Sequence, residues 1–486
     1  MTAVITDVRQ QRIVLFIIAF AAFMASLDST IVNISLPVIS EYYHVDFALV
    51  SWIVMAYLLV EASFLLMFGK LGDIHGFRKI FIGGFAAFTL GSLLCGFSDT
   101  IYHLIAFRVL QGIGGAALVA VAPAMVAVFL PAEKRGWAFG ILATVVSLGV
   151  AAGPILGGFL TEYLSWHWIF FINIPVGVVA VVAAYHLFPK DRVVRSAVKF
   201  DIAGSALICA ALTTLLYPLN QGLILGWTSP AILGLFLLSF ILWICFFVHE
   251  NRCPEPLVDL KLFNNRNFNL GNCAGLLLML SYAGSEFLLP FFFENIHGYT
   301  PSVAGLLLAV PAVALMVVGP VSGAFSDKYG SRAITSLAAL LAAISFLLFS
   351  MFSVTTGIGF IIAALSLLGI AVGLFFPPNM SQVLTDGGAE GEGVVSSVMM
   401  TVRNTGSVLG VALFSTIVVQ VILGLAPNAA DATAGAIPLH VFVAGFHAAF
   451  IVGIILSIVT LVLSVAIVKR KGATFEEKTQ TPSHVR

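Results

Sequence analysis

Five charged side chains lie within long apolar stretches of the sequence: the acids Asp28, Glu61 and Glu286 and the bases Arg108 and Arg403. A charge at the centre of a bilayer costs from about 2.5 kcal/mol upward, so such residues mark sites that bind ions, protons or substrates. A guanidinium beside a carboxylate favours the ionised form, and separating the two favours proton uptake. These residue types therefore indicate proton or cation binding rather than covalent catalysis.

The depths of Asp28 and Arg108 allow the two side chains to meet. Asp28 lies roughly 22 Å from the cytoplasmic start of its span, and hence roughly 8 Å from the outer face of an apolar core about 30 Å thick. Arg108 lies roughly 10 Å from that face by the same count. We expect the pair to be either a proton switch or a permanent structural ion pair.

The other three charges leave alternatives open. Glu61, one turn after Tyr57, is expected to take a proton, to pair with a cationic substrate, or only to tune the hydration of a cavity. Glu286 lies near the outer end of its span, where it either has a functional role or is merely interfacial. Arg403 lies at roughly mid-depth of its span. Arg403 is expected either to balance the charge of Glu286 or to hold the second bundle together through hydrogen bonds to backbone carbonyls.

The composition requires a membrane around these charges. Of 486 residues, 60% are hydrophobic and 9% are charged, against roughly 25% charged in soluble proteins. Lys+Arg and Asp+Glu number 23 each, so no net charge indicates a nucleic-acid partner. The five cysteines are odd in number and lack paired spacing. They are expected to be packing residues, neither disulfide-bonded nor bound to a metal.

Apolar runs predict an all-α polytopic membrane protein with fourteen spans. Six lie at about 13–38, 48–69, 80–98, 101–129, 137–162 and 166–188, and two at about 202–220 and 230–249. Six more lie at about 268–294, 301–325, 333–353, 357–380, 393–424 and 440–468. The predicted units are a tail at 1–12, a six-helix bundle at 13–190, an inserted hairpin at 200–250, a second six-helix bundle at 267–468 and a tail at 469–486.

The basic residues orient these spans. With the N-terminus inside, 21 of the 23 Lys and Arg residues fall in the segments on the cytoplasmic side, and the other two are Arg108 and Arg403. Cytoplasmic loops carry such an excess, and a missed span would invert every later loop. We therefore expect both termini to be cytoplasmic in a multi-pass protein of the inner cell membrane.

A pattern of four residues occurs twice, offset by 254 positions. The first copy is Gly69, Asp73, Gly76 and Arg78, and the second is Gly323, Asp327, Gly330 and Arg332. Basic residues hold each turn inside, and glycine allows the turn to be tight. The repeat predicts duplicated bundles that open a midplane site to either side.

The fifth predicted span combines small residues with a proline: Gly149, Gly153, Pro154, Gly157 and Gly158. Glycines spaced by four allow two helices to approach closely. Pro154 lacks a backbone donor, so a bend is expected. This span is therefore a candidate moving part.

The segment 69–79 resembles the signature loop of the major facilitator superfamily. Residues 27–37 and 108–115 resemble first-helix and fourth-helix motifs of its drug:proton antiporters, and 153–158 is similar to the antiporter motif of its exporters. With the six-two-six count, residues 13–468 resemble the fourteen-spanner branch, the EmrB/QacA type. The resemblance implies the major facilitator fold, proton transfer at the motif of Arg108, and a latch between the bundles at Asp73 and Arg78.

The expected function is proton-coupled export of amphipathic, cationic small molecules by alternating access. Proton coupling is expected at Asp28, Arg108, Glu61 and Glu286. The expected substrate cavity is lined by Glu61, Tyr57, Asn33, Gln111, Glu286 and Arg403. Neither a cofactor nor a nucleic acid is expected. The expected partners are substrates, protons and the lipid bilayer, and the protein is expected to act as a monomer.

Two alternatives remain at this point. One is an exporter dedicated to an endogenous metabolite, a lipid or a siderophore. The other is a membrane-embedded enzyme. His249 is followed by Glu250, but the second His of a metal-hydrolase motif is missing from the sequence, which argues against the enzyme.

Overall fold

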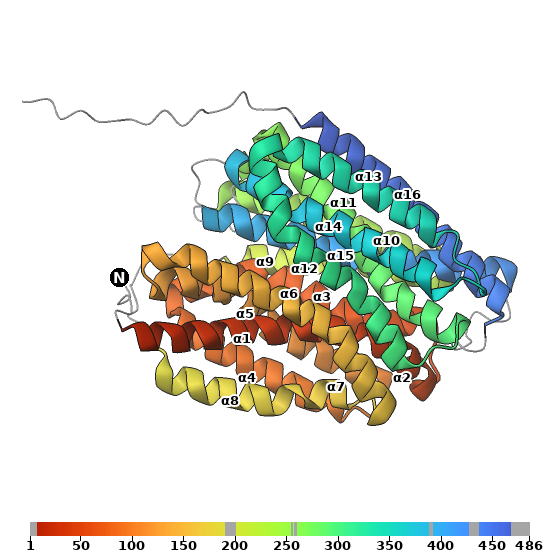
Figure 1. Ribbon diagram of the computed structural model, residues 1–486, viewed down its shortest axis with the longest axis horizontal. Helices are drawn as coiled ribbons and strands as arrows, with labels where there is room; N and C mark the ends of the chain where they lie inside the picture. Colours follow the sequence, from red (N-terminus) through yellow and green to blue (C-terminus); the bar gives the residue numbers. More distant parts are fainter. Residues whose placement is uncertain are drawn as a thin grey trace, which may run out of the picture.

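The computed structural model describes residues 7–189, 201–253, 256, 260–387, 392–426 and 437–467 as helices joined by short connections (Figure 1). The N-terminal half contains α1 (Val8–Ile31), η1 (Asn33–Ser35), α2 (Leu36–Tyr43), α3 (Phe47–His75), α4 (Phe77–Gly96), α5 (Ile101–Phe129), α6 (Ala132–Tyr163), α7 (Trp168–Phe171) and α8 (Asn173–Leu187). A hairpin of α9 (Ile202–Leu225) and α10 (Pro230–Arg252) follows. The C-terminal half contains η2 (Leu260–Asn264), α11 (Arg266–Phe291), η3 (Phe292–Ile296), α12 (Pro301–Tyr329), α13 (Ser331–Phe349), α14 (Ile358–Asp386), α15 (Glu392–Leu425) and α16 (Leu439–Ala466).

Within these described ranges, thirteen helical segments are long and apolar enough to cross a membrane. They correspond to thirteen of the fourteen predicted spans. The remaining one corresponds to α9, whose apolar part, Ala203–Leu219, is shorter. The whole of α9 has 24 residues. At 1.5 Å per residue it is long enough for an apolar core of about 30 Å. The protein is therefore all-helical and multi-pass in its described part.

The two halves share one packing pattern. In the N-terminal half α5 packs on α3 and α4, α1 on α6, and α4 on α8. In the C-terminal half α14 packs on α12 and α13, α11 on α15, and α13 on α16. The halves contact each other along two seams, where α6 meets α12 and where α3 meets α15. Matching each helix to its counterpart in the other half converts one seam into the other. This is the arrangement that a duplicated bundle related by a two-fold axis produces.

The repeated sequence pattern builds the same turn twice. α3 ends at Gly76 with φ 99°, and α12 ends at Gly330 with φ 84°. Glycine adopts such positive φ values without steric cost. The segment 69–79 was expected to be a loop, but α3 continues to His75, because neither a proline nor a positive φ interrupts it before Gly76. The turn is therefore a single glycine between two helices.

The two turns differ by a matched pair of residues. In the first, a Cβ on Gly72 would lie 2.5 Å from the ring of Phe77. In the second, Ser326 stands in place of Gly72 and Ser331 in place of Phe77, and the two hydroxyl oxygens are 3.1 Å apart. Because Ser331 lacks the aromatic ring of Phe77, the second turn has room for the side chain of Ser326, and the turn is preserved.

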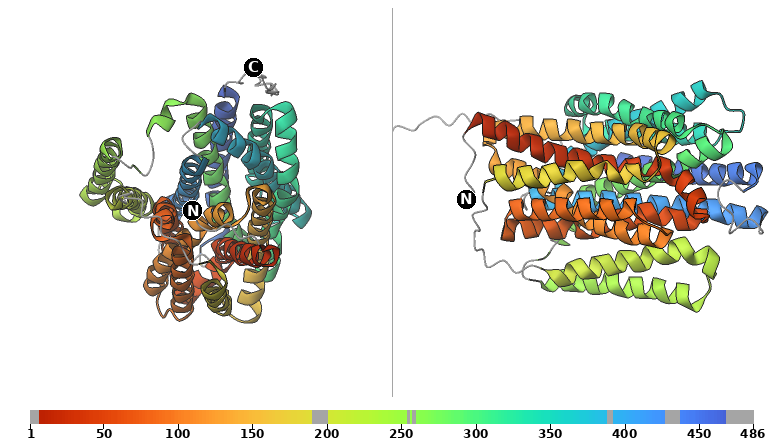
Figure 2. Two further views of the ribbon diagram at one scale, coloured as in Figure 1. Left: turned by 90° about the vertical axis from the view of Figure 1, so that its left-hand side faces the viewer. Right: turned by 90° about the horizontal axis from the view of Figure 1, so that it is seen from below.

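The hairpin of α9 and α10 lies against the seam between α3 and α15, on one side of the molecule (Figure 2). The rings of Trp52 on α3 and Tyr217 on α9 have centroids 5.9 Å apart. Thr416 on α15 donates a hydrogen bond to the carbonyl of Leu219 at 2.8 Å. The inserted hairpin thus contacts both halves.

The halves meet closely at the end of the molecule opposite the N-terminus (Figure 1). The backbone N–H of Ser302 on α12 donates to Glu162 Oε2 on α6 at 3.0 Å. Phe47 on α3 has its ring centroid 5.1 Å from that of Phe287 and 4.6 Å from that of Phe291, both on α11. We call this the closed end.

The space around individual glycines shows that the packing between the halves changes along the molecule. A Cβ on Gly158 of α6 would collide with the carbonyl of Pro301 in the other half. Gly69 of α3 and Gly323 of α12 lie toward the end where the chain begins, and a Cβ on either would meet no atom within 4 Å. The ribbons of the two halves diverge toward that end, which we call the open end (Figure 1). Among the described residues, the two halves therefore pack more closely toward the closed end than toward the open end.

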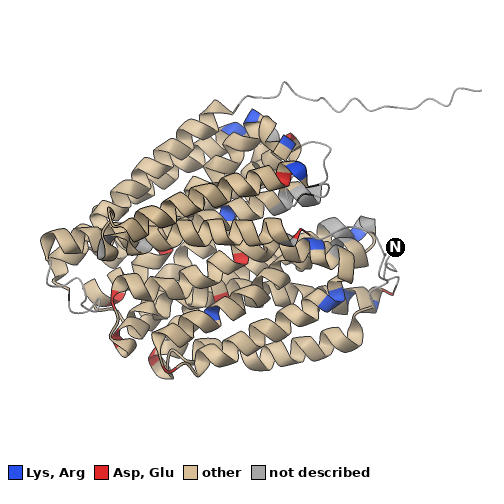
Figure 3. Cartoon of the chain, turned by 180° about the vertical axis from the view of Figure 1, so that it is seen from behind, with Lys and Arg blue, Asp and Glu red and all other residues tan. Residues whose placement is uncertain are grey.

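Basic residues gather toward the open end, whereas acidic residues also occupy the closed end (Figure 3). The outer parts of the predicted tails, residues 1–6 and 468–486, lie outside the described residues, as does most of the predicted connection 190–200. The side chains of Asp73 and Asp327 likewise lie outside the described part.

Candidate functional site

Asp28 and Arg108 form an ion pair inside the N-terminal half. Asp28 lies on α1 and Arg108 on α5, and Arg108 Nη1 is 2.7 Å from Asp28 Oδ2. The Asp28 side chain is 0% exposed and that of Arg108 is 1% exposed. The similar depth inferred from the sequence is therefore correct, and the two side chains do meet.

Two amide side chains complete the binding of the carboxylate. Gln111 Nε2 and Asn173 Nδ2 donate to Asp28 Oδ1 at 2.7 and 2.8 Å. Both amides also donate to the Ser92 hydroxyl, at 2.7 and 3.2 Å. Arg108 Nη1 donates to Gln111 Oε1 at 2.7 Å. These five residues, from α1, α4, α5 and α8, form what we call the Asp28 network, and all are buried.

The guanidinium of Arg108 is also held by α3. Arg108 Nε donates to the carbonyl of Ile53 at 3.1 Å. Arg108 Cζ lies 4.1 Å from the ring centroid of Tyr57 and 6.0 Å from that of Phe170. A cation over an aromatic ring is stabilised by the charge distribution of the ring, most strongly where water is excluded. The charge is thus enclosed by protein groups on several sides.

This network makes the charge of Asp28 depend on helix positions. A buried carboxylate needs an opposite charge and hydrogen-bond donors, and Asp28 accepts from Arg108, Gln111 and Asn173. The donors belong to α5 and α8, whereas Asp28 belongs to α1. A shift of α1 relative to α5 and α8 would therefore favour protonation. Chemically, the arrangement can couple a proton to helix movement.

The structure reassigns two residues that were expected to line the cavity. Gln111 is 0% exposed and belongs to the Asp28 network. Tyr57 is 1% exposed and packs on Arg108. The sequence analysis missed Ser92 and Asn173. Both are polar residues inside apolar spans, which is a usable signal, but their partners lie on other helices.

Glu61 lies between the Asp28 network and the other half. Its carboxyl interacts electrostatically with Arg403 on α15, and next with Arg108 and Asp28. Arg403 Cζ lies 4.9 Å from the ring centroid of Phe376 on α14. Because α3 packs against α15, Glu61 and Arg403 link the two halves at the seam that also carries the hairpin.

Glu286 is the acidic counterpart in the C-terminal half. It lies on α11 beside Tyr282, one turn earlier, and the two side chains interact. Glu286 is 8% exposed and Tyr282 is 7% exposed. Arg403 interacts electrostatically with Tyr282 and with Glu61. Arg403 was expected either to balance the charge of Glu286 or to bond backbone carbonyls. In the structure its guanidinium interacts with the carboxyl of Glu61.

Asn33, also expected in the cavity, lies in η1, where the first helix is interrupted. α2 begins within a residue of Pro37, which lacks a backbone donor and so favours a helix start. Asn33 is 8% exposed, and its Oδ1 atom is buried without a hydrogen-bond partner. It therefore lies on the closed-end side of Asp28, apart from the network.

The glycines of α6 allow two close approaches. Gly149 and Gly157 face α1, where a Cβ would lie 2.7 Å from the Phe23 carbonyl and 2.6 Å from the Ile31 carbonyl. A Cβ on Gly153 would collide with the hydroxyl of Thr30. Toward the other half, a Cβ on Gly305 of α12 would collide with the Pro154 carbonyl. This helix therefore contacts both the helix of Asp28 and the opposite half.

Arg78, one of the two predicted latch residues, contacts its own half in this structure. A guanidinium N–H of Arg78 donates to the carbonyl of Tyr185 on α8. Arg78 Cζ also lies 5.4 Å from the ring centroid of that tyrosine. Arg332 stands at the equivalent position of the second turn, where it begins α13 after Ser331. Both basic residues lie at the open end.

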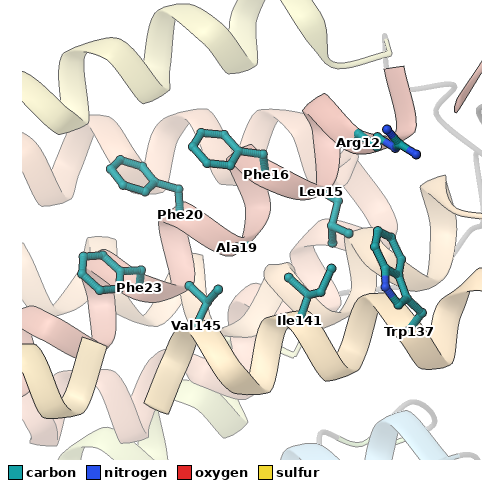
Figure 4. A pocket seen from close by; sticks show the side chains of 9 residues that line it. All are labelled: Arg12, Leu15, Phe16, Ala19, Phe20, Phe23, Trp137, Ile141 and Val145. Carbon is teal, nitrogen blue, oxygen red and sulfur yellow. The ribbon is translucent and has the colours of Figure 1, made fainter. Parts of the chain in front are cut away.

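Two apolar grooves lie apart from these charges. One, of about 430 Å³, is lined by Arg12, Leu15, Phe16, Ala19, Phe20 and Phe23 of α1 and by Trp137, Ile141 and Val145 of α6 (Figure 4). The other, of about 470 Å³, lies where Leu219 and Trp227 meet α11 and α15. Neither is lined by an acidic residue. They suit apolar groups, and the charged residues must act elsewhere.

The fold and this arrangement are those of a membrane transporter built from two homologous halves. The family model of the Major Facilitator Superfamily matches residues 18–411. The chain therefore belongs to the major facilitator superfamily and is a transporter rather than an enzyme. This membership agrees with the resemblance seen in the sequence motifs.

Curated relatives match most of the chain. A riboflavin transporter of Clostridioides difficile is 33% identical over 85% of this chain and 89% of its own. A tetracenomycin C resistance and export protein of Streptomyces glaucescens is 33% identical over 82% of this chain and 74% of its own. A multidrug resistance protein of Mycobacterium tuberculosis is 30% identical over 84% and 76%.

One solved structure supports the fold. It is a bacterial homologue of the human lysosomal transporter Spinster, in an inward-facing and unoccupied conformation. The TM-score is 0.67 over 94% of this chain and 97% of that chain, with 14% sequence identity. Structural similarity at this level of identity shows the shared fold.

Proposed function

We propose that this protein is a proton-coupled exporter of amphipathic, cationic small molecules, of the fourteen-spanner drug:proton antiporter type. The observation that carries the proposal is the buried Asp28–Arg108 pair at 2.7 Å, which Glu61 links to the opposite half. Relatives that export tetracenomycin C or confer multidrug resistance support the direction of transport.

The proposed topology follows the distribution of basic residues. α9 serves as the fourteenth span, and both termini lie in the cytoplasm of a cell with this protein in its inner membrane. The open end then faces the cytoplasm, which makes this the inward-facing conformation. Residues 13–190 and 267–468 act as the two bundles, 200–250 as an inserted hairpin, and one chain suffices for transport.

The proposed cycle uses the two seams. In the inward-facing state Asp28 is ionised and held by Arg108, Gln111 and Asn173. Rocking moves α1 and α6 together, because glycines join these helices closely. The movement loosens the Asp28 network and admits a proton from outside. Asp73 and Arg78 then serve as the latch that holds the cytoplasmic end closed.

The driving force is sufficient for export. An inward proton releases about 2.3 kcal/mol per 100 mV of membrane potential and about 1.4 kcal/mol per pH unit. Substrate binds between the halves near Glu61, Glu286 and Arg403, where two acids and one base favour a cation. Phe376 beside Arg403 and Tyr282 beside Glu286 supply aromatic faces for the apolar part of an amphipathic molecule.

A second candidate is a carrier dedicated to one metabolite. The riboflavin transporter covers this chain as fully as the drug exporters do. The second candidate keeps the same fold and the same Asp28 network, but it predicts a single substrate.

A screen in a bacterial host that lacks its own pumps separates these candidates. Cells that express the protein are tested for resistance to lipophilic cations, for dye efflux and for riboflavin release, each with and without an uncoupler. Uncoupler-sensitive efflux of several cations supports the multidrug exporter. Movement of riboflavin alone, with no protection against any cation, would replace it with the dedicated carrier.

A further inference from the structure

A cluster of metal-ligand residues lies at the end of the inserted hairpin, remote from the Asp28 network. Asp201 begins α9, and His249 and Cys253 lie one turn apart at the end of α10. One potential ligand atom from each of the three residues falls within 4.8 Å of the others. The hairpin therefore brings together an oxygen, a nitrogen and a sulfur donor.

Local hydrogen bonds hold this geometry. Asp201 Oδ1 accepts from the backbone N–H of Gly204 at 2.8 Å, and it lies 2.7 Å from His249 Nε2. The backbone N–H of Cys253 donates to the carbonyl of His249 at 2.8 Å. Both ends of the hairpin are thus fixed before any ligand binds.

One polar atom in the cluster is buried without a partner. The Asp201 side chain is 3% exposed. Its Oδ2 atom has no hydrogen bond of ordinary geometry, and the side chain beside it that interacts with Asp201 is that of Glu250. A buried acceptor in this state is costly and calls for a missing group. Oδ2 therefore calls for either a proton shared with Glu250 or a bound cation.

A second carboxyl lies beside the first. The Glu250 side chain is 2% exposed, and it interacts with that of Asp201. Gly204 gives both carboxyls room, because a Cβ there would touch Asp201 Oδ2 and lie 2.6 Å from Glu250 Oε1. Two buried carboxylates repel each other unless a proton or a cation lies between them. Burial alone raises the pKa of Asp201, but the hydrogen bonds from Gly204 and His249 outweigh it and lower the pKa overall.

We propose that Asp201, His249 and Cys253 bind a Zn²⁺ ion that joins the two ends of the inserted hairpin, with Glu250 or a water molecule as the fourth ligand. Imidazole and thiolate ligands favour Zn²⁺ over Mg²⁺ or Ca²⁺, which prefer oxygen alone. His249 is 33% exposed, so an ion can reach it from the open end. The expectation from the sequence that Cys253 only fills space is thereby revised.

The test uses the full-length protein, purified in detergent with an affinity tag that contains no histidine and stripped with a chelator. Co²⁺ is the probe, because its spectrum reports tetrahedral geometry and thiolate ligation, and Zn²⁺ is the competitor. We expect a thiolate-to-Co²⁺ absorption band in the wild type that Zn²⁺ removes, and one bound Zn²⁺ per chain by elemental analysis.

Variants assign the ligands. Cys253→Ser should abolish the thiolate band, and Asp201→Asn and His249→Ala should weaken Co²⁺ binding by about tenfold or more. Cys245→Ser is the matched control, because Cys245 is exposed on the same helix. Thermal unfolding of each variant without metal shows whether it is folded, and Zn²⁺ should raise the Tm of the wild type but not of Cys253→Ser. No band in the wild type, or an unchanged band in Cys253→Ser, would overturn the proposal.

Discussion

Asp28 and Glu286 are both buried acids in helices that correspond under the repeat, yet their surroundings differ. Asp28 is 0% exposed, and it accepts hydrogen bonds from a guanidinium and two amides, all within its own half. Glu286 is 8% exposed and interacts with the phenol of Tyr282. Duplication supplied the same helices twice, but among the described residues the acid of the N-terminal half has a guanidinium and two amides around it, whereas Glu286 has a phenol. The N-terminal half therefore holds an ionised carboxylate in this conformation.

The largest effect is expected at Arg108. Arg108→Ala leaves Asp28 buried without its counter-charge, and breaking a buried pair in this way costs about 3–5 kcal/mol of folding stability. A large fall in Tm in detergent is the measurement. The double variant Asp28→Asn with Arg108→Ala should recover most of that loss because no lone charge remains. No recovery in the double variant would mean that packing of the Arg108 side chain, and not charge, stabilises this region.

The next effect is expected at Asn173, which the sequence analysis missed. Asn173→Ala removes a hydrogen bond to a charged group, worth about 1.5–3 kcal/mol. Urea or thermal unfolding would measure the loss, and proton-coupled transport should weaken because the Asp28 network is incomplete. Asn269→Ala on α11 is a control outside the network. Equal losses in both variants would remove Asn173 from the network.

Gly158 tests how the two halves close. Gly158→Ala places a Cβ against the carbonyl of Pro301, and overpacking of this kind costs about 1–3 kcal/mol. The population with the closed end sealed should therefore fall, which spin-label distances across α6 and α12 would detect. Gly140→Ala, on the same helix, meets no atom within 4 Å and should leave the distances unchanged. A similar shift in both variants would contradict the proposed contact.

The smallest effect on stability is expected at Glu286. Glu286→Gln keeps the shape and loses no ion pair, so the free energy of unfolding should change by less than about 1 kcal/mol. Its effect should appear instead in substrate choice, as weaker transport of lipophilic cations than of neutral compounds. Transport assays with a charged and a neutral substrate would measure this. An equal decline for both would show that Glu286 does not select substrates by charge.

The sequence could predict features that depend on position along one helix. Thirteen candidate spans and the meeting of Asp28 with Arg108 follow from length and depth, because every helix must cross the same apolar layer. Features that depend on rotation about a helix axis could not be predicted. Gln111 was therefore assigned to the cavity and Asn173 was missed, although both bind the same carboxylate oxygen.

Contacts between distant segments were the other limit. The sequence analysis paired Arg403 with Glu286 or with carbonyls, whereas α3 brings Glu61 to Arg403 from the opposite half. The cysteines were treated singly, because the spacing between Asp201 and His249 does not reveal that a hairpin closes on itself. Both cases concern neighbours that only the packing of helices brings together.

The role of Asp28 can be measured directly in proteoliposomes. Wild-type protein and Asp28→Asn are reconstituted with a pH-sensitive dye inside, and a lipophilic cation is added to drive exchange across an imposed pH gradient. The wild type should move protons and the cation in opposite directions, whereas Asp28→Asn should bind the cation but move no protons. Undiminished proton movement by well-folded Asp28→Asn would show that another group carries the proton.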